Sequence, residues 1–201
     1  IENSADAQTS QPETAHSQRQ PQNQPPKQSA VDQAFALYEE ATALYNEGTS
    51  ESLQAAAEKS EAALVIAEDI ADEGTQLTAK FVISTQAGLI QAALGEHNAA
   101  LEYYQQSLEV ALASDDFSQV AIAQSNIAAT QLTMGNPDAA IGSYRQALVI
   151  ARDNGNRAGE AAMLSNIGGV YDETGDRTQA LDYYQQSLVI SQEIGDKTNE
   201  A

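Results

Sequence analysis

The chain has 201 residues and carries 29 acidic against 9 basic side chains, which gives a formal net charge of −20. This charge argues against nucleic acids and anionic membrane surfaces as partners, because both are bound through clustered Lys and Arg. The absence of Cys excludes disulfides, thiolate nucleophiles and cysteine-ligated zinc, and no apolar run is long enough to span a bilayer.

Residues 1–29 contain four of the five prolines and a Gln-rich run, but almost no large apolar side chain. Such a segment cannot bury enough surface to offset its ordering entropy, so we predict a disordered Gln/Pro-rich tether. The chain starts with Ile1 and not with Met, and this composition fits a position behind a removed signal peptide. The sequence therefore favours an extracytoplasmic location (secreted or periplasmic), and a cytoplasmic location is the alternative.

From residue 30 onward the sequence repeats itself with a period of 40. One frame of small, aliphatic and Tyr positions recurs in "ALEYYQQSLEV" from Ala100, "AIGSYRQALVI" from Ala140 and "ALDYYQQSLVI" from Ala180. The predicted repeats span about 30–73, 75–114, 115–154 and 155–195, with the start of a fifth helix pair at 196–201. The first repeat is divergent and acidic, as in an end cap, and its spacing of 44 suggests extra residues in the turn "EGTSES".

The last repeat shows why each unit should be a pair of helices. One helical face is formed by Leu164, Ile167, Gly168 and Tyr171, and a second stripe by Leu181, Tyr184 and Leu188. Between them Gly175 is placed to end the first helix, and Asp176 to cap the second. Gly135 and Asn136, and before them Gly95, predict the same turn in the preceding repeats. Gly195 and Asp196 predict a further turn after the last pair.

Two other frame positions predict how the helices of one pair pack. Gly88, Ala128 and Gly168 fall in register, and two glycines and one alanine at one position imply a close helix–helix contact. The Tyr stripe formed by Tyr104, Tyr144 and Tyr184 is expected to lie in the core.

These positions resemble the tetratricopeptide repeat, here through Gly168, Gly175, Ala180, Tyr184 and Ser187 and their equivalents in the preceding repeats. The resemblance implies an all-α protein, a right-handed α-solenoid of antiparallel helix pairs. The longer period is similar to the subclass found in kinesin light chain and in bacterial arrays. The segment "LYNEGTSESLQAAAEKSEAAL" with the "YYQQSL" repeats also resembles the amino-terminal array of cyanobacterial proteins that carry a caspase-like CHAT domain.

In such a solenoid the first helix of each pair lines the concave side. The face of these helices that is not used for packing carries the candidate peptide-binding residues: Thr85, Gln86, Ser125, Asn126, Ser165, Asn166 and Asp172. A row of amides, formed by Gln86, Asn126 and Asn166, could bond both the N–H and C=O groups of an extended backbone. The alternative is that these amides are only solvated.

No set of residues suggests catalysis. The two histidines are His16, in the tether, and His97, which is expected to be solvated at a helix start, so we expect no enzyme activity, metal or cofactor. The predicted function is a scaffold that binds an extended peptide or protein surface, neutral or basic because only Lys80 lies near the groove positions. Alternatives are the regulatory or substrate-recognition part of a larger CHAT-type peptidase, or a self-assembling rod. Because Leu188 and Ile194 would lie uncovered on the last helix, we expect either self-association through it or marginal stability of the last repeat.

Overall fold

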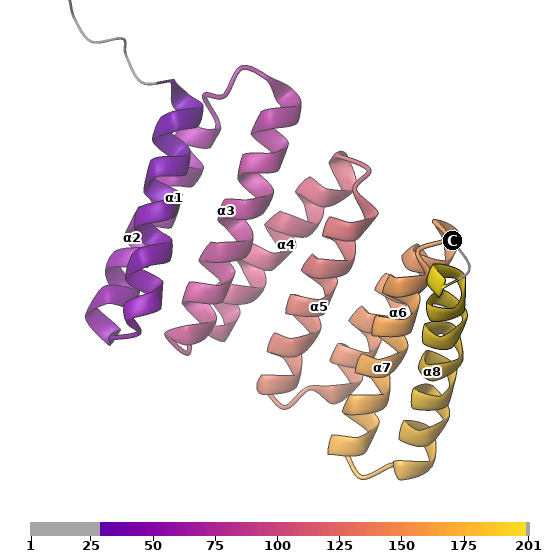
Figure 1. Cartoon of the computed structure of the whole chain (residues 1–201). Coiled ribbons are helices and arrows are strands. Elements are labelled where there is room, and N and C mark those ends of the chain that lie inside the picture. Colours follow the sequence, from indigo (N-terminus) through magenta and orange to yellow (C-terminus); the bar gives the residue numbers. More distant parts are fainter. Residues whose placement is uncertain (1–28, 200–201) are drawn as a thin grey trace, which may run out of the picture.

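The computed structural model describes residues 29–199, which form eight α-helices and contain no strand (Figure 1). The helices are α1 (Ala30–Glu47), α2 (Ser50–Ala67), α3 (Glu73–Ala93), α4 (His97–Ala113), α5 (Phe117–Thr133), α6 (Pro137–Asp153), α7 (Arg157–Glu173) and α8 (Arg177–Asn199). They pack as four antiparallel pairs, α1–α2, α3–α4, α5–α6 and α7–α8, which follow one another along the molecule. The prediction of an all-α solenoid of helix pairs is confirmed. None of these helices is both long and apolar enough to cross a membrane.

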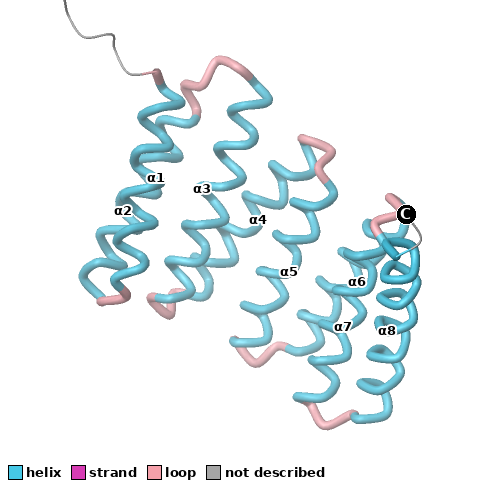
Figure 2. The backbone as a smooth tube through the Cα atoms, in the orientation of Figure 1, coloured by secondary structure: helices cyan, strands magenta, loops and turns pink. Residues whose placement is uncertain are grey.

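The two rows of helices are not equivalent. The backbones of α1, α3, α5 and α7 approach one another from pair to pair, whereas within the described range the even-numbered helices of neighbouring pairs meet only through long side chains, as where the Tyr103 hydroxyl of α4 donates to Glu61 of α2 at 3.2 Å. A stack of helix pairs curves toward the row whose helices lie closer together. The odd-numbered helices therefore form the concave side. Figure 2 shows the helix pairs placed in sequence order along the array.

The turns confirm the predicted helix ends at Gly95, Gly135 and Gly175. Five turn residues have a positive φ between 65° and 88°: Gly48, Gly95, Gly135, Gly155 and Gly175. At the turn between α4 and α5 this place is taken by Asp115, with a φ of 51°. Asp176 caps α8 as predicted, because its Oδ1 accepts a hydrogen bond from the Gln179 N–H at 3.1 Å. Asn136 stands at the start of α6 but makes no capping hydrogen bond through its side chain.

The beginning of the array differs from the predicted boundaries in two ways. Ser29 is the N-cap of α1, where it forms a reciprocal capping box with Asp32, so the ordered array begins one residue earlier than predicted. The rest of the predicted tether, residues 1–28, lies outside the described residues. The extra residues of the first repeat are not in the turn at Gly48 and Thr49, which is the shortest of the array. They lie in α3, which has 21 residues where α5 and α7 have 17.

The packing of the Tyr stripe changes along the chain. Tyr104 and Tyr144 are buried, as predicted, in apolar clusters that join one helix pair to the next. Tyr184 is 39% exposed, so the prediction of a core position is wrong for the last repeat. The reason is that α5 covers α4 and α7 covers α6, whereas no described helix follows α8.

The carboxyl-terminal helix departs from prediction for the same reason. Leu181, which the sequence pattern placed on the packed stripe, is 58% exposed, whereas Leu188 is 57% exposed, as predicted for the uncovered face of the last helix. Ile194, predicted to be uncovered, is half-buried against the core of the last two pairs. The predicted turn at Gly195 and the fifth helix from 196 are also wrong, because α8 continues to Asn199.

Candidate functional site: the concave groove

Three hollows adjoin one another on the concave side, each sharing a wall residue with the other two. The aromatic hollow, about 390 Å³, lies between α1, α3 and α5, and its walls include Tyr38, Tyr45, Phe81, Val82, Leu89 and Ile122. The central hollow, about 250 Å³, lies where α3, α4 and α5 meet, and its walls include Leu89, His97, Tyr104, Asn126 and Ala129. The amide hollow, about 420 Å³, lies between α5 and α7, and its walls include Ile122, Ser125, Asn126, Ala158 and Ala162.

The groove carries almost no charge. Apart from His97, none of the side chains that line the three hollows is acidic or basic. This is unexpected in a chain with a net charge of −20. The acidic residues must therefore be spread over other surfaces, and an occupant of the groove meets neutral walls.

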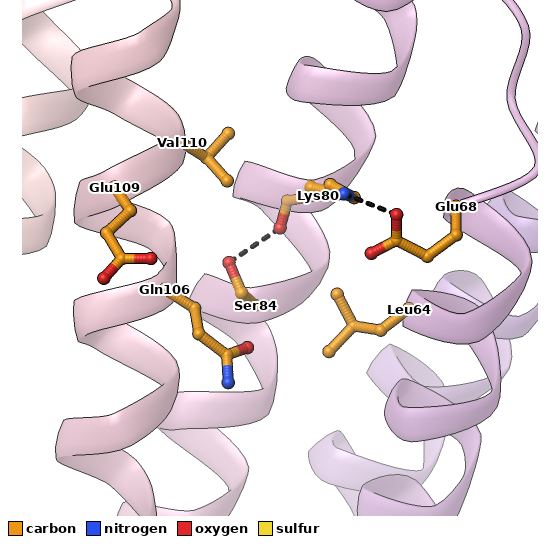
Figure 3. Close-up of a pocket in the computed structure, with 7 residues that line it drawn as sticks. All are labelled: Leu64, Glu68, Lys80, Ser84, Gln106, Glu109 and Val110. Atoms are coloured by element: carbon orange, nitrogen blue, oxygen red, sulfur yellow. Dashed lines mark hydrogen bonds and ion pairs between the residues drawn. The ribbon is translucent and has the colours of Figure 1, made fainter.

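Lys80, the only basic residue that the sequence placed near the groove, does not enter it. Its ammonium nitrogen lies 2.7 Å from a carboxylate oxygen of Glu68, and both residues line a separate cleft between α2, α3 and α4 (Figure 3). In the same cleft the Ser84 hydroxyl donates to the Lys80 carbonyl at 2.6 Å. The groove is thus left without a cation that could pair with a ligand carboxylate.

The structure brings only some of the predicted binding residues together. Ser125 and Asn126 share the amide hollow, and Thr85 and Gln86 line the aromatic hollow. Ser165 lines another hollow, between α7 and α8. The remaining two lie on α7 outside these hollows: Asn166 is half-buried and Asp172 is exposed.

Gln86 differs from the expectation, because its amide is used inside the protein. Its Nε2 donates to the Tyr38 carbonyl at 3.3 Å and to the Thr42 hydroxyl, and its Oε1 accepts from the Ser60 hydroxyl at 3.4 Å. The residue is only 9% exposed. Gln86 therefore ties α3 to the first helix pair, and the predicted row of three amides is reduced to two.

The two asparagines keep their hydrogen-bonding capacity. Asn126 and Asn166 are half-buried at equivalent positions of α5 and α7, and neither side chain hydrogen-bonds to another described residue. Ser125, beside Asn126, donates its hydroxyl to the Ala121 carbonyl at 2.8 Å. An amide that is partly removed from water and has no protein partner can donate to and accept from the backbone of a ligand.

Two polar atoms in the groove are buried without a partner, and the one on His97 was missed by the sequence analysis. His97 is not simply solvated, because its Nδ1 is buried without a hydrogen-bond partner at the wall of the central hollow. Thr85 Oγ1 is likewise buried and unpaired. Nearby, burial and the proximity of Tyr45 raise the pKa of Tyr104 to about 12, so its phenol stays neutral. The spacing of His97, Ala100 and Tyr104 on one face of α4 was the available signal for His97.

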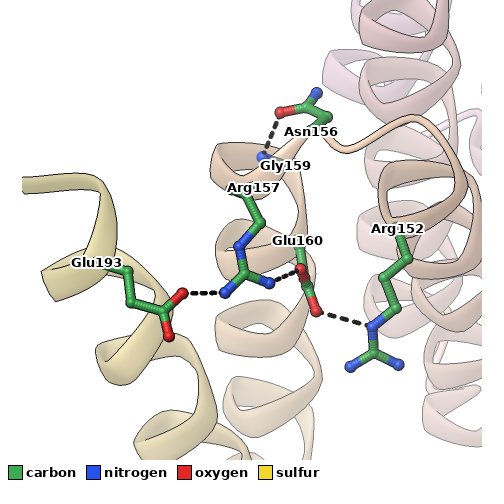
Figure 4. A network of polar contacts seen from close by, with 6 residues as sticks. All are labelled: Arg152, Asn156, Arg157, Gly159, Glu160 and Glu193. Carbon is green, nitrogen blue, oxygen red and sulfur yellow. Dashed lines mark hydrogen bonds and ion pairs between the residues drawn. The ribbon is translucent and has the colours of Figure 1, made fainter. Parts of the chain in front are cut away.

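A charged network on the other side of α7 was also not anticipated. Glu160 is buried and accepts hydrogen bonds from Arg152 Nε at 2.8 Å and from Arg157 Nη1, and Arg157 also pairs with Glu193 (Figure 4). These residues belong to α6, α7 and α8, so the network holds the last two helix pairs together. Among residues 29–199, no three His, Asp or Glu side chains are grouped so that they could hold a metal ion.

The model of the tetratricopeptide repeat family matches residues 80–153 and, in an overlapping register, residues 119–193. The chain belongs to the tetratricopeptide repeat family. These two matches cover the second to fourth helix pairs of the tetratricopeptide array, and the acidic first pair lies outside them. No curated protein matches the chain in sequence.

Solved structures of other repeat proteins are similar to the array in fold. A signal-transduction ATPase with a tetratricopeptide repeat sensor from Pyrococcus horikoshii has a TM-score of 0.71 at 18% identity, over 87% of this chain and 26% of that one. The apo form of RapI has a TM-score of 0.69 at 16% identity, and the match covers 83% of this chain and 45% of RapI. The Rap conjugation gene regulator of plasmid pLS20, solved with the Phr* peptide, has a TM-score of 0.61 at 16% identity. This match covers 80% of this chain and 43% of the regulator.

The chain thus spans less than half the length of these solved proteins, and at such identities the likeness concerns the fold alone. The kinesin-light-chain subclass and the CHAT-type context stay predictions from the sequence.

Proposed function

We propose that this tetratricopeptide array is a non-enzymatic interaction scaffold whose concave groove holds an extended peptide or the extended segment of a partner protein. The observation that carries the proposal is the pair Asn126 and Asn166, two half-buried amides without protein partners on the inner helices. Side-chain amides of this kind can pair with both backbone groups of an extended chain. Ser125 and Ser165 stand beside them, and Thr85 lines the same side of the array.

The likeness to the pLS20 Rap regulator supports a peptide as the occupant. That protein was solved in complex with a peptide, and its fold resembles the array over 80% of the present chain. Small side chains at the walls of the amide hollow, including Ala158, Gly159 and Ala162, allow a backbone to approach the helices closely.

The charge of the groove supports a neutral or basic ligand. A ligand carboxylate buried there would lose its hydration without meeting a Lys or Arg, and this costs several kcal/mol, on the order of 3 or more. The net charge of −20 would in addition slow the approach of an acidic segment. We therefore expect the array to reject peptides with an acidic carboxyl terminus.

The test is a peptide array probed with the wild type and with the double variant Asn126→Ala and Asn166→Ala. Loss of both amides should weaken binding by about 1–3 kcal/mol, because backbone groups of the bound peptide lose their partners. The matched control is the double variant Asn98→Ala and Gln105→Ala, which removes two exposed amides of α4 outside the hollows. Selective capture of acidic carboxyl termini, or equal binding by the amide variant, would exclude this mechanism.

A second candidate function is self-assembly through α8. The stripe formed by Leu181, Tyr184 and Leu188 is exposed, although the equivalent residues of α6 are buried under the next pair. Between Thr178 and Gln192 the helix carries a single charged residue, Asp182, so a second copy could approach this face with little repulsion.

A further inference from the structure

The two ends of the groove differ in the size of their side chains. The aromatic hollow is walled by Tyr38, Tyr45, Phe81, Val82, Leu89 and Ile122. The amide hollow is walled mostly by alanine, glycine and serine, with Asn126 as its unpaired polar group. Ile122 lies at the wall of both hollows, so a segment bound along the groove would pass from one environment directly to the other.

Two polar side chains of the aromatic hollow, Gln86 and Thr42, are bonded within the protein, and Asn46 lies exposed at its wall. The Gln86 amide bonds to α1 and α2, and the Thr42 hydroxyl donates to the Tyr38 carbonyl at 2.8 Å. The hydroxyl oxygen of Thr85 is buried below the surface without a partner. What the hollow offers to an occupant is therefore mainly aromatic and aliphatic carbon, part of it exposed on Leu89 and Ile122, which are 42% and 48% accessible.

We propose that the aromatic hollow is an anchor site that takes one bulky, uncharged apolar side chain of the bound segment, while the amide hollow next to it takes backbone with small side chains. The inference rests on the proposed function and specifies the ligand. The volume of about 390 Å³ is at the small end of ligand pockets, so it suits a single side chain better than a cofactor. Removing such a side chain from water is favourable in proportion to the apolar area buried.

Charge decides against other occupants of the hollow. No acidic side chain lines it to attract a Lys or Arg of the ligand, and no basic one lines it to attract an Asp or Glu. A charged ligand side chain would thus be desolvated there without compensation. A neutral apolar side chain has no such cost.

The experiment uses an array of uncharged Gly/Ser/Asn-rich peptides in which one position is scanned through Gly, Ala, Leu, Phe, Trp, Lys and Asp. The wild-type chain should bind the Leu, Phe and Trp peptides at least about tenfold more tightly than the Gly, Lys and Asp peptides. Leu89→Glu and Leu89→Asn, which place a polar group at the hollow, should abolish this preference. Leu112→Glu is the matched control, because Leu112 is similarly exposed, at 51%, on α4 outside the groove. Circular dichroism of each variant checks that it is folded.

The outcomes separate this inference from the proposed function. Binding that does not depend on the scanned residue, or a preference that survives both Leu89 variants, would overturn the anchor site and leave peptide binding in place. The double variant Asn126→Ala and Asn166→Ala should weaken the binding of all peptides by a similar factor and keep the ranking of their affinities. If no peptide binds the wild type, both proposals fail.

Discussion

The ring of Tyr104 lies so close to Gly88 that a Cβ added to this glycine would come within 2.5 Å of the ring carbon Cε1. The same relationship recurs between Gly168 and Tyr184, at 2.9 Å. The glycines predicted from the register of the repeats thus have a specific partner, the Tyr of the second helix in the same pair. In the third pair Ala128 occupies the equivalent position and is fully buried, so the helices of this pair leave room for a Cβ there.

We expect Gly88→Ala to lower the free energy of unfolding by about 1–3 kcal/mol, because the buried Tyr104 has no room to move and the core is overpacked. Gly168→Ala should lower the free energy of unfolding by less, since Tyr184 is partly exposed and its ring can turn away. Gly142→Ala is the control: its Cβ would meet nothing within 4 Å, so the better helix propensity of Ala should raise stability by about 1 kcal/mol. Urea unfolding measures all three. Equal effects of Gly88→Ala and Gly142→Ala would contradict the contact.

Asp115 provides a second prediction, because it has a φ of 51° where the next repeat has Gly155 at 65°. The left-handed conformation is costly for a residue with a Cβ, even for Asp, which tolerates it better than most. Asp115→Gly should therefore raise the midpoint of thermal unfolding, with a gain of about 1 kcal/mol in the free energy of unfolding. The reciprocal change Gly155→Asp should lower it. A loss of stability in Asp115→Gly would show that the Asp side chain makes a compensating contribution at this turn.

The network around Glu160 predicts a dependence of stability on pH. Burial by itself would raise the pKa of Glu160, but hydrogen bonds and positive charge from Arg152 and Arg157 outweigh burial and hold the pKa below its ordinary value. A carboxyl whose pKa is lower in the folded state stabilises the fold above its unfolded-state pKa, about 4.3. This contribution is lost as the pH falls through the lower, folded-state pKa.

Glu160→Gln should accordingly reduce the free energy of unfolding at neutral pH by about 1–3 kcal/mol, because the charged hydrogen bonds to two arginines are weakened. The difference between wild type and variant should shrink as the pH is lowered below about 4. Unfolding by urea at a series of pH values measures it. The control is Glu193→Gln, which changes the exposed partner of Arg157 and should have a much smaller effect. A constant difference across the pH range would exclude Glu160 as the titrating group.

The exposed stripe on α8 predicts self-association at high protein concentration, in line with its apolar character. Light scattering should show a mass that rises with concentration for the wild type, and a monomer for the double variant Leu181→Glu and Leu188→Glu. Val149→Glu is the control, because Val149 is 54% exposed on α6 and lies outside the stripe. A wild type that stays monomeric at every concentration would argue against assembly through this face.

Local sequence signals predicted the helices and turns of the array well. Gly95, Gly135 and Gly175 end helices because the left-handed conformation at a helix end is available to glycine without strain, and this is a property of the single residue. The register of Gly88 and Gly168 likewise predicted a close contact within one helix pair. In the structure the partner of Gly88 is Tyr104 and that of Gly168 is Tyr184.

What the sequence did not predict depends on neighbouring pairs. Gln86 occupies the same frame position as Asn126 and Asn166, but it meets the carbonyl of Tyr38 on α1 and is used for packing. Tyr184 has the same place in its repeat as Tyr104, but no described helix follows to cover it. A repeat pattern describes one unit at a time, and these differences arise from what lies next to the unit.

The close backbone approach of the odd-numbered helices, without a matching approach of the even-numbered ones, also has a mechanical consequence. Neighbouring pairs can rotate about the inner row, and in the outer row such a rotation is resisted only by exposed side-chain contacts such as the one between Arg145 and Tyr183. Small rotations between neighbouring pairs, too small to break any one contact, add up along four pairs into a change in the width of the groove. A segment that touches α3, α5 and α7 at once would hold those rotations fixed. Binding in the groove would therefore stiffen the whole array, including surfaces that the ligand never touches.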